Sequence, residues 1–228
     1  MTENIILLRH YIFINPYNIF GDINNNIILN EIKKIHKKNY TNGEIVKYYG
    51  YTDIVKLLNN YDYELSKLFL ELNYNYPALL ADIGRLIILY THGGIYHDLK
   101  CMSNNKMNNY LKLVSSEIEL IGEEHPITKH RVRNTNIIAL HKNSNFIKSV
   151  LEKIKNKLKN EKNAFGHNKV FEIGSRIYID EFLNNIDNRI YKYPFQNTHM
   201  LKMNNVIYSK NIKKWQNTDE YIFKQVKK

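Results

Sequence analysis

The sequence predicts an α/β sandwich built on a mostly parallel sheet. Short β-branched and aromatic runs alternate along the chain with segments whose apolar residues recur at helical spacing. The 228 residues are 43% hydrophobic, which is ordinary for a globular chain, and 4 prolines and 9 glycines leave few linkers. A chain of this length can bury one sizeable core. We therefore expect a single domain over residues 1–228, with helices on both faces of the sheet.

The N-terminal part of the chain predicts two strands and three helices. Their expected order is a strand at residues 4–14, a helix at 25–39, a strand at 43–50 and helices at 52–60 and 62–73. In the first helix, Ile28, Ile32 and Ile35 lie at helical spacing with lysines on the opposite face. Thr52 is the expected N-cap of the second helix.

Proline and glycine set the bounds of the next helix. Pro77 is suited to a first helical turn, and Gly93 to the position just after a helix ends. The elements expected from here on are this helix, a strand at 93–102, strands at 116–124 and 135–141, and an amphipathic helix at 143–162. The glycine pair Gly93-Gly94 predicts a sharp turn, because glycine reaches backbone angles that other residues avoid.

Charge and cysteine content limit the classes of partner and location. The net charge is +11, from 33 Lys and Arg against 22 Asp and Glu, which favours anionic partners. Lys, Asn, Ile and Tyr are enriched together, however, as an AT-rich genome produces. The single cysteine excludes an internal disulfide. The apolar start is interrupted by Arg9, His10 and Pro16, so we expect neither a signal peptide nor a membrane span. We expect a cytoplasmic location.

The stretch ADIGRLIILYTHGGIYHDLKCM, residues 81–102, carries the candidate chemistry. Asp82 and Arg85 are three residues apart and share one helix face. Gly84 between them costs a helix about 1 kcal/mol relative to alanine, which indicates close packing against the backbone there. In the strand that follows, alternation places Asp98 and Lys100 on one face, at the sheet end where α/β folds bind ligands. The four charged groups can therefore converge on one crevice.

This stretch resembles the signature of the DXD-containing sugar transferases of glycosyltransferase family 32. That family includes initiating mannosyltransferases, and the glucosylating domains of clostridial toxins share its core. Its pattern is roughly (S/A)-D-x-x-R-x-x-x-L-x-x-x-G-G-x-Y-x-D-x-D. Eight positions match in fixed register: Ala81, Asp82, Arg85, Leu89, Gly93, Gly94, Tyr96 and Asp98. Such a match is far more specific than a glycine pair alone.

The resemblance implies a Rossmann-like GT-A fold and transfer of a sugar from a nucleotide-sugar donor to a hydroxyl of a glycan or protein acceptor. It also implies retention of the donor's anomeric configuration. The implied donor-binding residues are Asp82, Arg85, Gly94, Tyr96, Asn136 and Trp215. Asp98 would contact the ribose and a divalent metal, Mn²⁺ or Mg²⁺. Ser175 stands where the family's Gly-Pro segment has its proline.

Lys100 departs from the pattern, because the family has its second acid there. An ammonium group cannot coordinate a cation and repels it at contact distance. Three interpretations stay open. Lys100 replaces the metal as the charge that stabilises the leaving diphosphate, so that it joins Asp98 as a catalytic residue. Alternatively, the metal binds through Asp98 and a distant carboxylate such as Asp180 or Asp219, or the site has lost turnover.

The same residues also allow interpretations other than a transferase. Asp82 and Arg85 could form an ordinary surface ion pair worth under about 1 kcal/mol. The first rival function is a non-catalytic member of the same fold that binds a nucleotide-sugar or a glycan. The second is a basic nucleic-acid-binding protein, against which stands the lack of any recognised nucleic-acid-binding motif. No P-loop, dinucleotide-binding or zinc motif is present in the sequence.

Overall fold

A six-stranded sheet forms the centre of the protein. The computed structural model describes residues 8–15, 17–40, 44–99, 101–103, 118–124, 132–187, 189–194, 198–200 and 220–224. The strands are β1 (Leu8–Ile12), β2 (Ile45–Tyr49), β3 (Gly94–His97), β5 (Leu120–Glu124), β6 (Val132–Ala139) and β7 (Ile190–Pro194). They lie in the order β2-β1-β3-β6-β5-β7. β4 (Cys101–Ser103) and β8 (Thr198–Met200) form a separate antiparallel pair.

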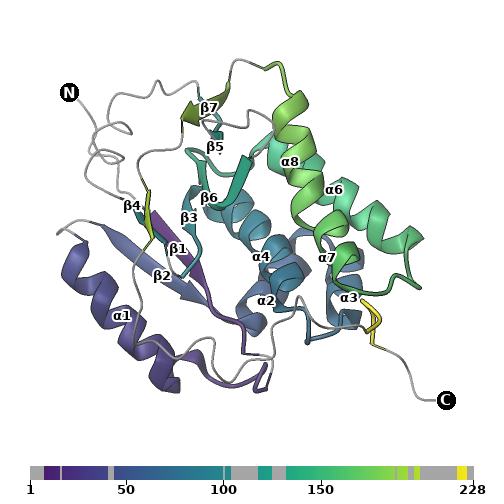
Figure 1. Cartoon of the computed structure of the whole chain (residues 1–228), viewed down its shortest axis with the longest axis horizontal. Helices are drawn as coiled ribbons and strands as arrows, with labels where there is room; N and C mark the ends of the chain where they lie inside the picture. The colour runs from purple at the N-terminus through teal and green to yellow at the C-terminus, as the bar shows by residue number, and fades with distance from the viewer. Residues whose placement is uncertain are drawn as a thin grey trace.

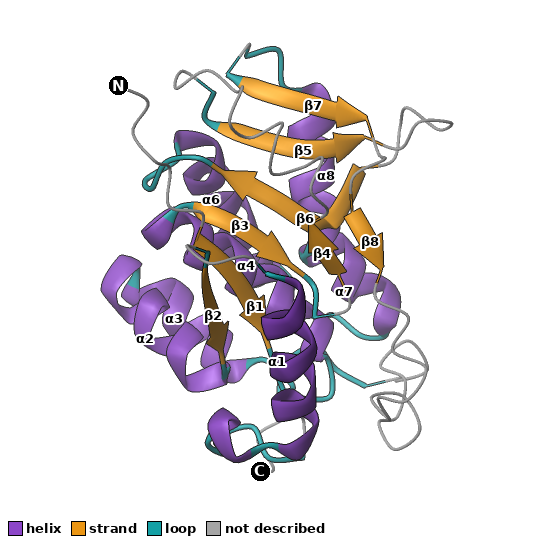
Figure 2. Cartoon of the chain, turned by 90° about the vertical axis from the view of Figure 1, so that its left-hand side faces the viewer, coloured by secondary structure: helices purple, strands orange, loops and turns teal. Residues whose placement is uncertain are grey.

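The sheet is mostly parallel. β2, β1 and β3 run in one direction, and β5 and β7 are parallel to each other. β6 is antiparallel to both of its neighbours, β3 and β5 (Figure 2). The carboxyl ends of β1, β2 and β3 therefore meet at one edge of the sheet, which is where ligands bind in open α/β folds.

Helices cover both faces of the sheet. The helices are α1 (Ile27–Asn39), α2 (Tyr51–Tyr61), α3 (Tyr63–Glu71), α4 (Pro77–His92), α6 (Asn145–Asn160), α7 (His167–Ile173) and α8 (Ser175–Asn184), with a short 3₁₀ turn at Ile23–Asn25. α1 lies on one side of the sheet and the other helices on the opposite side (Figure 1). Alternation along β1 serves both sides, since Tyr11 packs with the α1 cluster and Ile12 with the large core. The predicted fold class is confirmed.

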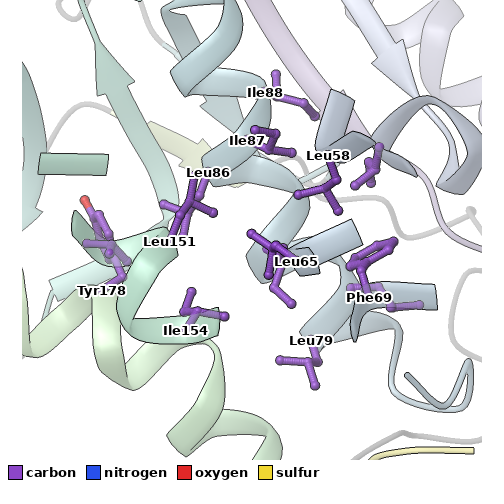
Figure 3. Close-up of a cluster of buried hydrophobic side chains, with 14 of the residues drawn as sticks. Leu58, Leu65, Phe69, Leu79, Leu86, Ile87, Ile88, Leu151, Ile154 and Tyr178 are labelled. Atoms are coloured by element: carbon purple, nitrogen blue, oxygen red, sulfur yellow. The ribbon is translucent and has the colours of Figure 1, made fainter. Parts of the chain in front are cut away.

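α4 is the central helix of the large core. It begins at Pro77 and ends before Gly93, as the sequence predicts. α4 contacts α2, α6 and α7, and its apolar residues share one core cluster with those of α3 and α8. Figure 3 labels side chains of this cluster from α2, α3, α4, α6 and α8. A Cβ on Gly84 would lie 2.6 Å from Ile54 Cδ1 and 3.0 Å from Ile12 Cδ1. The expected close packing at Gly84 is therefore confirmed, and it seats α4 against β1 and α2.

The turn from α4 into β3 depends on both of its glycines. Gly93 has φ +64° and Gly94 has φ +92°, which side chains rarely adopt. A Cβ on Gly94 would also overlap the carbonyl oxygen of Leu8. His10 Nε2 donates to the Gly93 carbonyl over 2.7 Å, so His10 Nδ1 is left to accept from Tyr49 Oη, 3.0 Å away. The neutral ring thus ties the turn to β1 and β2.

We expect acid to destabilise the protein through its buried histidines, among them His10, His36 and His97. Burial lowers the pKa of both His10 and His36 from 6.5 to about 4. The unfolded chain therefore binds these protons at a higher pH than the folded chain does. The stability is complete above pH 6.5 and declines as the pH falls toward 4, by up to about 1.4 kcal/mol per pH unit for each histidine.

This dependence can be measured by urea unfolding between pH 4.5 and 7.5. His36→Gln removes one of the titrating groups and should reduce the slope, while His10 and His97 still titrate. A free energy of unfolding that is constant over this range would contradict the expectation.

Two local predictions are wrong. The N-cap of α2 is Gly50 rather than Thr52, because Gly50 N–H donates to Asp53 Oδ2 over 2.9 Å and the helix begins at Tyr51. The strand expected over 93–102 is interrupted at Asp98 and Leu99, where Cys101 N–H closes a turn onto the Asp98 carbonyl at 2.7 Å. The single domain over residues 1–228 stays a prediction.

Candidate functional site

The pair formed by Asp82 and Arg85 is buried in α4. Both residues are 6% exposed, and Arg85 Nη2 is paired with Asp82 Oδ1. The sequence predicts that they share one helix face, and this is confirmed. The alternative of a surface ion pair is wrong, because both residues are buried, α7 contacts α4 and Ser175 of α8 contacts Asp82. Burying two charges is costly unless they are paired, so each residue depends on the other to be buried in its charged form.

The start of α8 closes onto Asp82. Ser175 Oγ donates to Asp82 Oδ2 over 2.7 Å. Gly174 is the N-cap of α8, and a Cβ there would overlap the same carboxylate. Gly174 and Ser175, which resemble the family's Gly-Pro segment, are thus in contact with the motif, more than ninety residues away along the chain.

Tyr96 connects the buried pair to Asp98. The Arg85 guanidinium carbon lies 5.2 Å from the centre of the Tyr96 ring. Tyr96 Oη donates to Asp98 Oδ1 over 2.8 Å. Burial, reinforced by the Asp98 carboxylate, raises the pKa of Tyr96 well above its usual value, so the phenol stays protonated and acts as the donor. Ser175, Asp82, Arg85, Tyr96 and Asp98 thus form one continuous set of contacts.

Asp98 lies at the shared edge of the parallel strands. His10 of β1 is level with Tyr96, and Ile12 of β1 is level with Tyr49 of β2. Asp98 follows β3 by one residue and is therefore level with the ends of β1 and β2. Its side chain is partly exposed. The sequence correctly predicts that Asp98 shares a side with Tyr96 at the carboxyl end of the sheet.

A pocket of about 640 Å³ opens at the end of β2. It is lined by residues 20–24, the end of β2 and the first turns of α2. Asp53, Lys47 and Lys56 give it both charges, and Phe20 and Tyr49 give it aromatic surface. Tyr49 and Asp98 are separated across the sheet by two strand spacings, which is about 10 Å. No residue here was assigned from the sequence, whose only signal is the strand-to-helix turn at Gly50.

The remaining candidates are placed as follows. Gly94 begins β3, and Asn136 lies on β6 opposite His97, next to the end of β3. The side chain of Asn136 lies outside the described part of the chain, as do Lys100 and Trp215.

The described residues do not by themselves complete a metal site. Among them, no group of three or more His, Cys, Asp or Glu side chains is placed to hold a metal ion. Asp180, a distant carboxylate weighed from the sequence, forms an exposed pair with Arg176 on α8 at 2.8 Å. Asp219 lies outside the described residues.

Comparison with known proteins identifies the class of this site. Residues 26–117 match the family model described as "Glycosyltransferase sugar-binding region containing DXD motif", which spans Asp82 through Asp98. Residues 26–117 are therefore a glycosyltransferase region of the DXD-containing type that the sequence resembles. Glycosyltransferases of that type commonly use divalent metals.

Two further comparisons were made. The solved structure named PaToxG glycosyltransferase is similar, with 19% identity over 80% of this chain and 70% of that chain and a TM-score of 0.48. No curated protein sequence matches. In the part of the chain that the structure describes, no helix combines the length and apolar character needed to cross a bilayer.

Proposed function

We propose that the protein transfers a sugar from a nucleotide-sugar donor to an acceptor hydroxyl on a glycan or protein. The observation that carries this proposal is the unbroken set of contacts from Ser175 and Asp82 through Arg85 and Tyr96 to Asp98. It joins a buried ion pair to a partly exposed carboxylate at the ligand-binding edge of the sheet.

The donor would extend along this edge. The sugar would lie beside Asp82 and Arg85, since a carboxylate and a guanidinium together accept from and donate to sugar hydroxyls. The ribose and diphosphate would lie near Asp98. The nucleoside would enter the pocket at the end of β2, whose distance of about 10 Å from Asp98 suits the length of a nucleotide. Gly94, Tyr96, Asn136 and Trp215 keep their proposed donor-binding roles.

The chemical step would follow from positioning and charge. The bond between the anomeric carbon and the diphosphate oxygen breaks, and its electron pair leaves with the diphosphate. The acceptor oxygen bonds to the anomeric carbon on the same face, which retains configuration, and its proton passes to the leaving oxygen. Tyr96 fixes Asp98, and Lys100 or a divalent ion would supply positive charge to the diphosphate.

A thermal-shift panel of nucleotide-sugars and nucleoside diphosphates, each with Mn²⁺ and with EDTA, tests the proposal. A ligand at one hundred times its Kd stabilises the folded state by about 2.7 kcal/mol, which corresponds to roughly 2–4 °C for a chain of this size. We expect a shift with the sugars of one nucleotide. A shift that survives EDTA would assign the stabilising charge to Lys100. The absence of a shift with every donor would overturn the proposal.

A non-catalytic binder is the second candidate, because Lys100 replaces an acid. Lys100→Asp distinguishes the two. If only the variant hydrolyses the donor with Mn²⁺ present, the native protein binds without turnover.

Nucleic-acid binding receives less support than either. Several lysines on α6, on α7 and in the segment between these helices form ion pairs with carboxylates. They are Lys153, Lys155, Lys157, Lys159, Lys162 and Lys169. Such lysines do not form a free basic face for phosphates.

A further inference from the structure

We propose that Ser175 is a positioning residue for the donor sugar, acting through Asp82. The inference rests on the proposed function, since it assigns Asp82 to the sugar. It adds a residue from α8 to a site that the signature alone places on α4 and β3.

The two oxygens of the Asp82 carboxylate are held by different elements. Oδ1 is paired with Arg85 from the same helix, and Oδ2 accepts from Ser175 Oγ at 2.7 Å. Ser175 is 8% exposed and Asp82 is 6% exposed, so water competes little for this bond. With one partner on each oxygen, the carboxylate plane is fixed. A carboxylate held by Arg85 alone could rotate about the Cβ–Cγ bond.

Gly174 allows this contact to form. A Cβ at position 174 would overlap Asp82 Oδ2 and lie 3.0 Å from Asp82 Cβ. The absence of a side chain therefore lets the first turn of α8 approach α4 closely enough for Ser175 to reach the carboxylate. The N-terminal end of a helix also favours a nearby negative charge such as that of Asp82.

The Ser175 hydroxyl distinguishes this sequence from the family that it resembles. The similar family has proline at this position, and proline offers neither a hydroxyl nor a backbone N–H. Ser175 thus supplies a restraint on Asp82 that the signature does not specify. Because this hydrogen bond is made to a charged group, its loss should weaken sugar binding about tenfold or more.

The test compares Ser175→Ala with Ser175→Thr, which keeps a hydroxyl. Ser66→Ala is a matched control, because Ser66 is a buried helical serine of α3 whose hydroxyl has no hydrogen-bond partner in the described structure. Isothermal titration would measure binding of uridine and guanosine diphosphate sugars and of the corresponding nucleoside diphosphates without sugar. If Ser175→Ala fails to fold, Ser175→Cys replaces it, since a thiol keeps the volume and is a weak donor.

We expect Ser175→Ala to weaken binding of the nucleotide-sugar about tenfold or more and to change binding of the nucleoside diphosphate much less. Ser175→Thr should restore most of the affinity, and Ser66→Ala should not change it. Equal losses for both ligands, or no loss at all, would overturn the positioning role. If the wild-type protein binds no nucleotide-sugar, the proposed function fails instead, and this outcome is separate because it does not depend on the Ser175 variants.

Discussion

Replacement of Asp98 by asparagine is expected to lower sugar transfer about 100-fold or more while the protein stays folded. In the native protein, Tyr96 Oη donates to Asp98 over 2.8 Å. Asparagine has nearly the same size, and its side-chain oxygen can still accept this hydrogen bond. Asp98 is partly exposed, so the loss of its charge costs little stability. The change removes the negative charge that is proposed to contact the ribose and a cation.

Transfer or hydrolysis of the donor found by the ligand panel would be measured, with Asp180→Asn as the control. Asp180 is an exposed carboxylate that pairs with Arg176 on α8. It is also the distant metal ligand considered from the sequence, so its variant tests that alternative. If Asp98→Asn retains full activity, the assignment of Asp98 is wrong. If Asp180→Asn loses activity as well, the metal alternative gains support.

Replacement of Arg85 by methionine is expected to lower the free energy of unfolding by about 3–5 kcal/mol. The reason is that Asp82 would remain as a buried charge without its ion-pair partner, although Ser175 still donates to it. The double variant Asp82→Asn, Arg85→Met should recover much of the stability, because it removes the stranded charge. It should not recover donor binding, since both proposed sugar contacts are altered.

Urea unfolding measures the stability change, and Arg176→Met is its control. Arg176 and Asp180 form an exposed i,i+4 pair, so their separation should cost under about 1 kcal/mol. A loss of similar size for Arg85→Met would mean that the buried pair behaves like a surface pair. A double variant that stays as unstable as Arg85→Met alone would contradict the stranded-charge explanation.

Elements whose signals are local could be predicted from the sequence. α4 begins at Pro77 and ends before Gly93, because proline and glycine constrain the backbone at their own positions. The side shared by Tyr96 and Asp98 follows from the alternation of a strand. The fold class follows from the order of helices and strands, which limits the topologies available.

Features that depend on distant segments could not be predicted. The burial of Asp82 and Arg85 depends on α7 and on the start of α8, which come about ninety residues later, and nothing local to α4 predicts this contact. The pocket at the end of β2 arises from three segments with separate local roles. The N-cap of α2 is Gly50 rather than Thr52, because the bond from the Gly50 N–H to Asp53 fixes the start of the helix two residues earlier.

The position of β1 makes the matched region depend on residues outside it. β1 lies between β2 and β3, with five residue pairs in register on one side and two on the other. The family match covers residues 26–117, which contain β2 and β3 but not β1. Without β1, the matched region lacks the strand that joins its two parallel strands. The sheet edge that carries Asp98 therefore depends on residues 8–12, which lie outside the match.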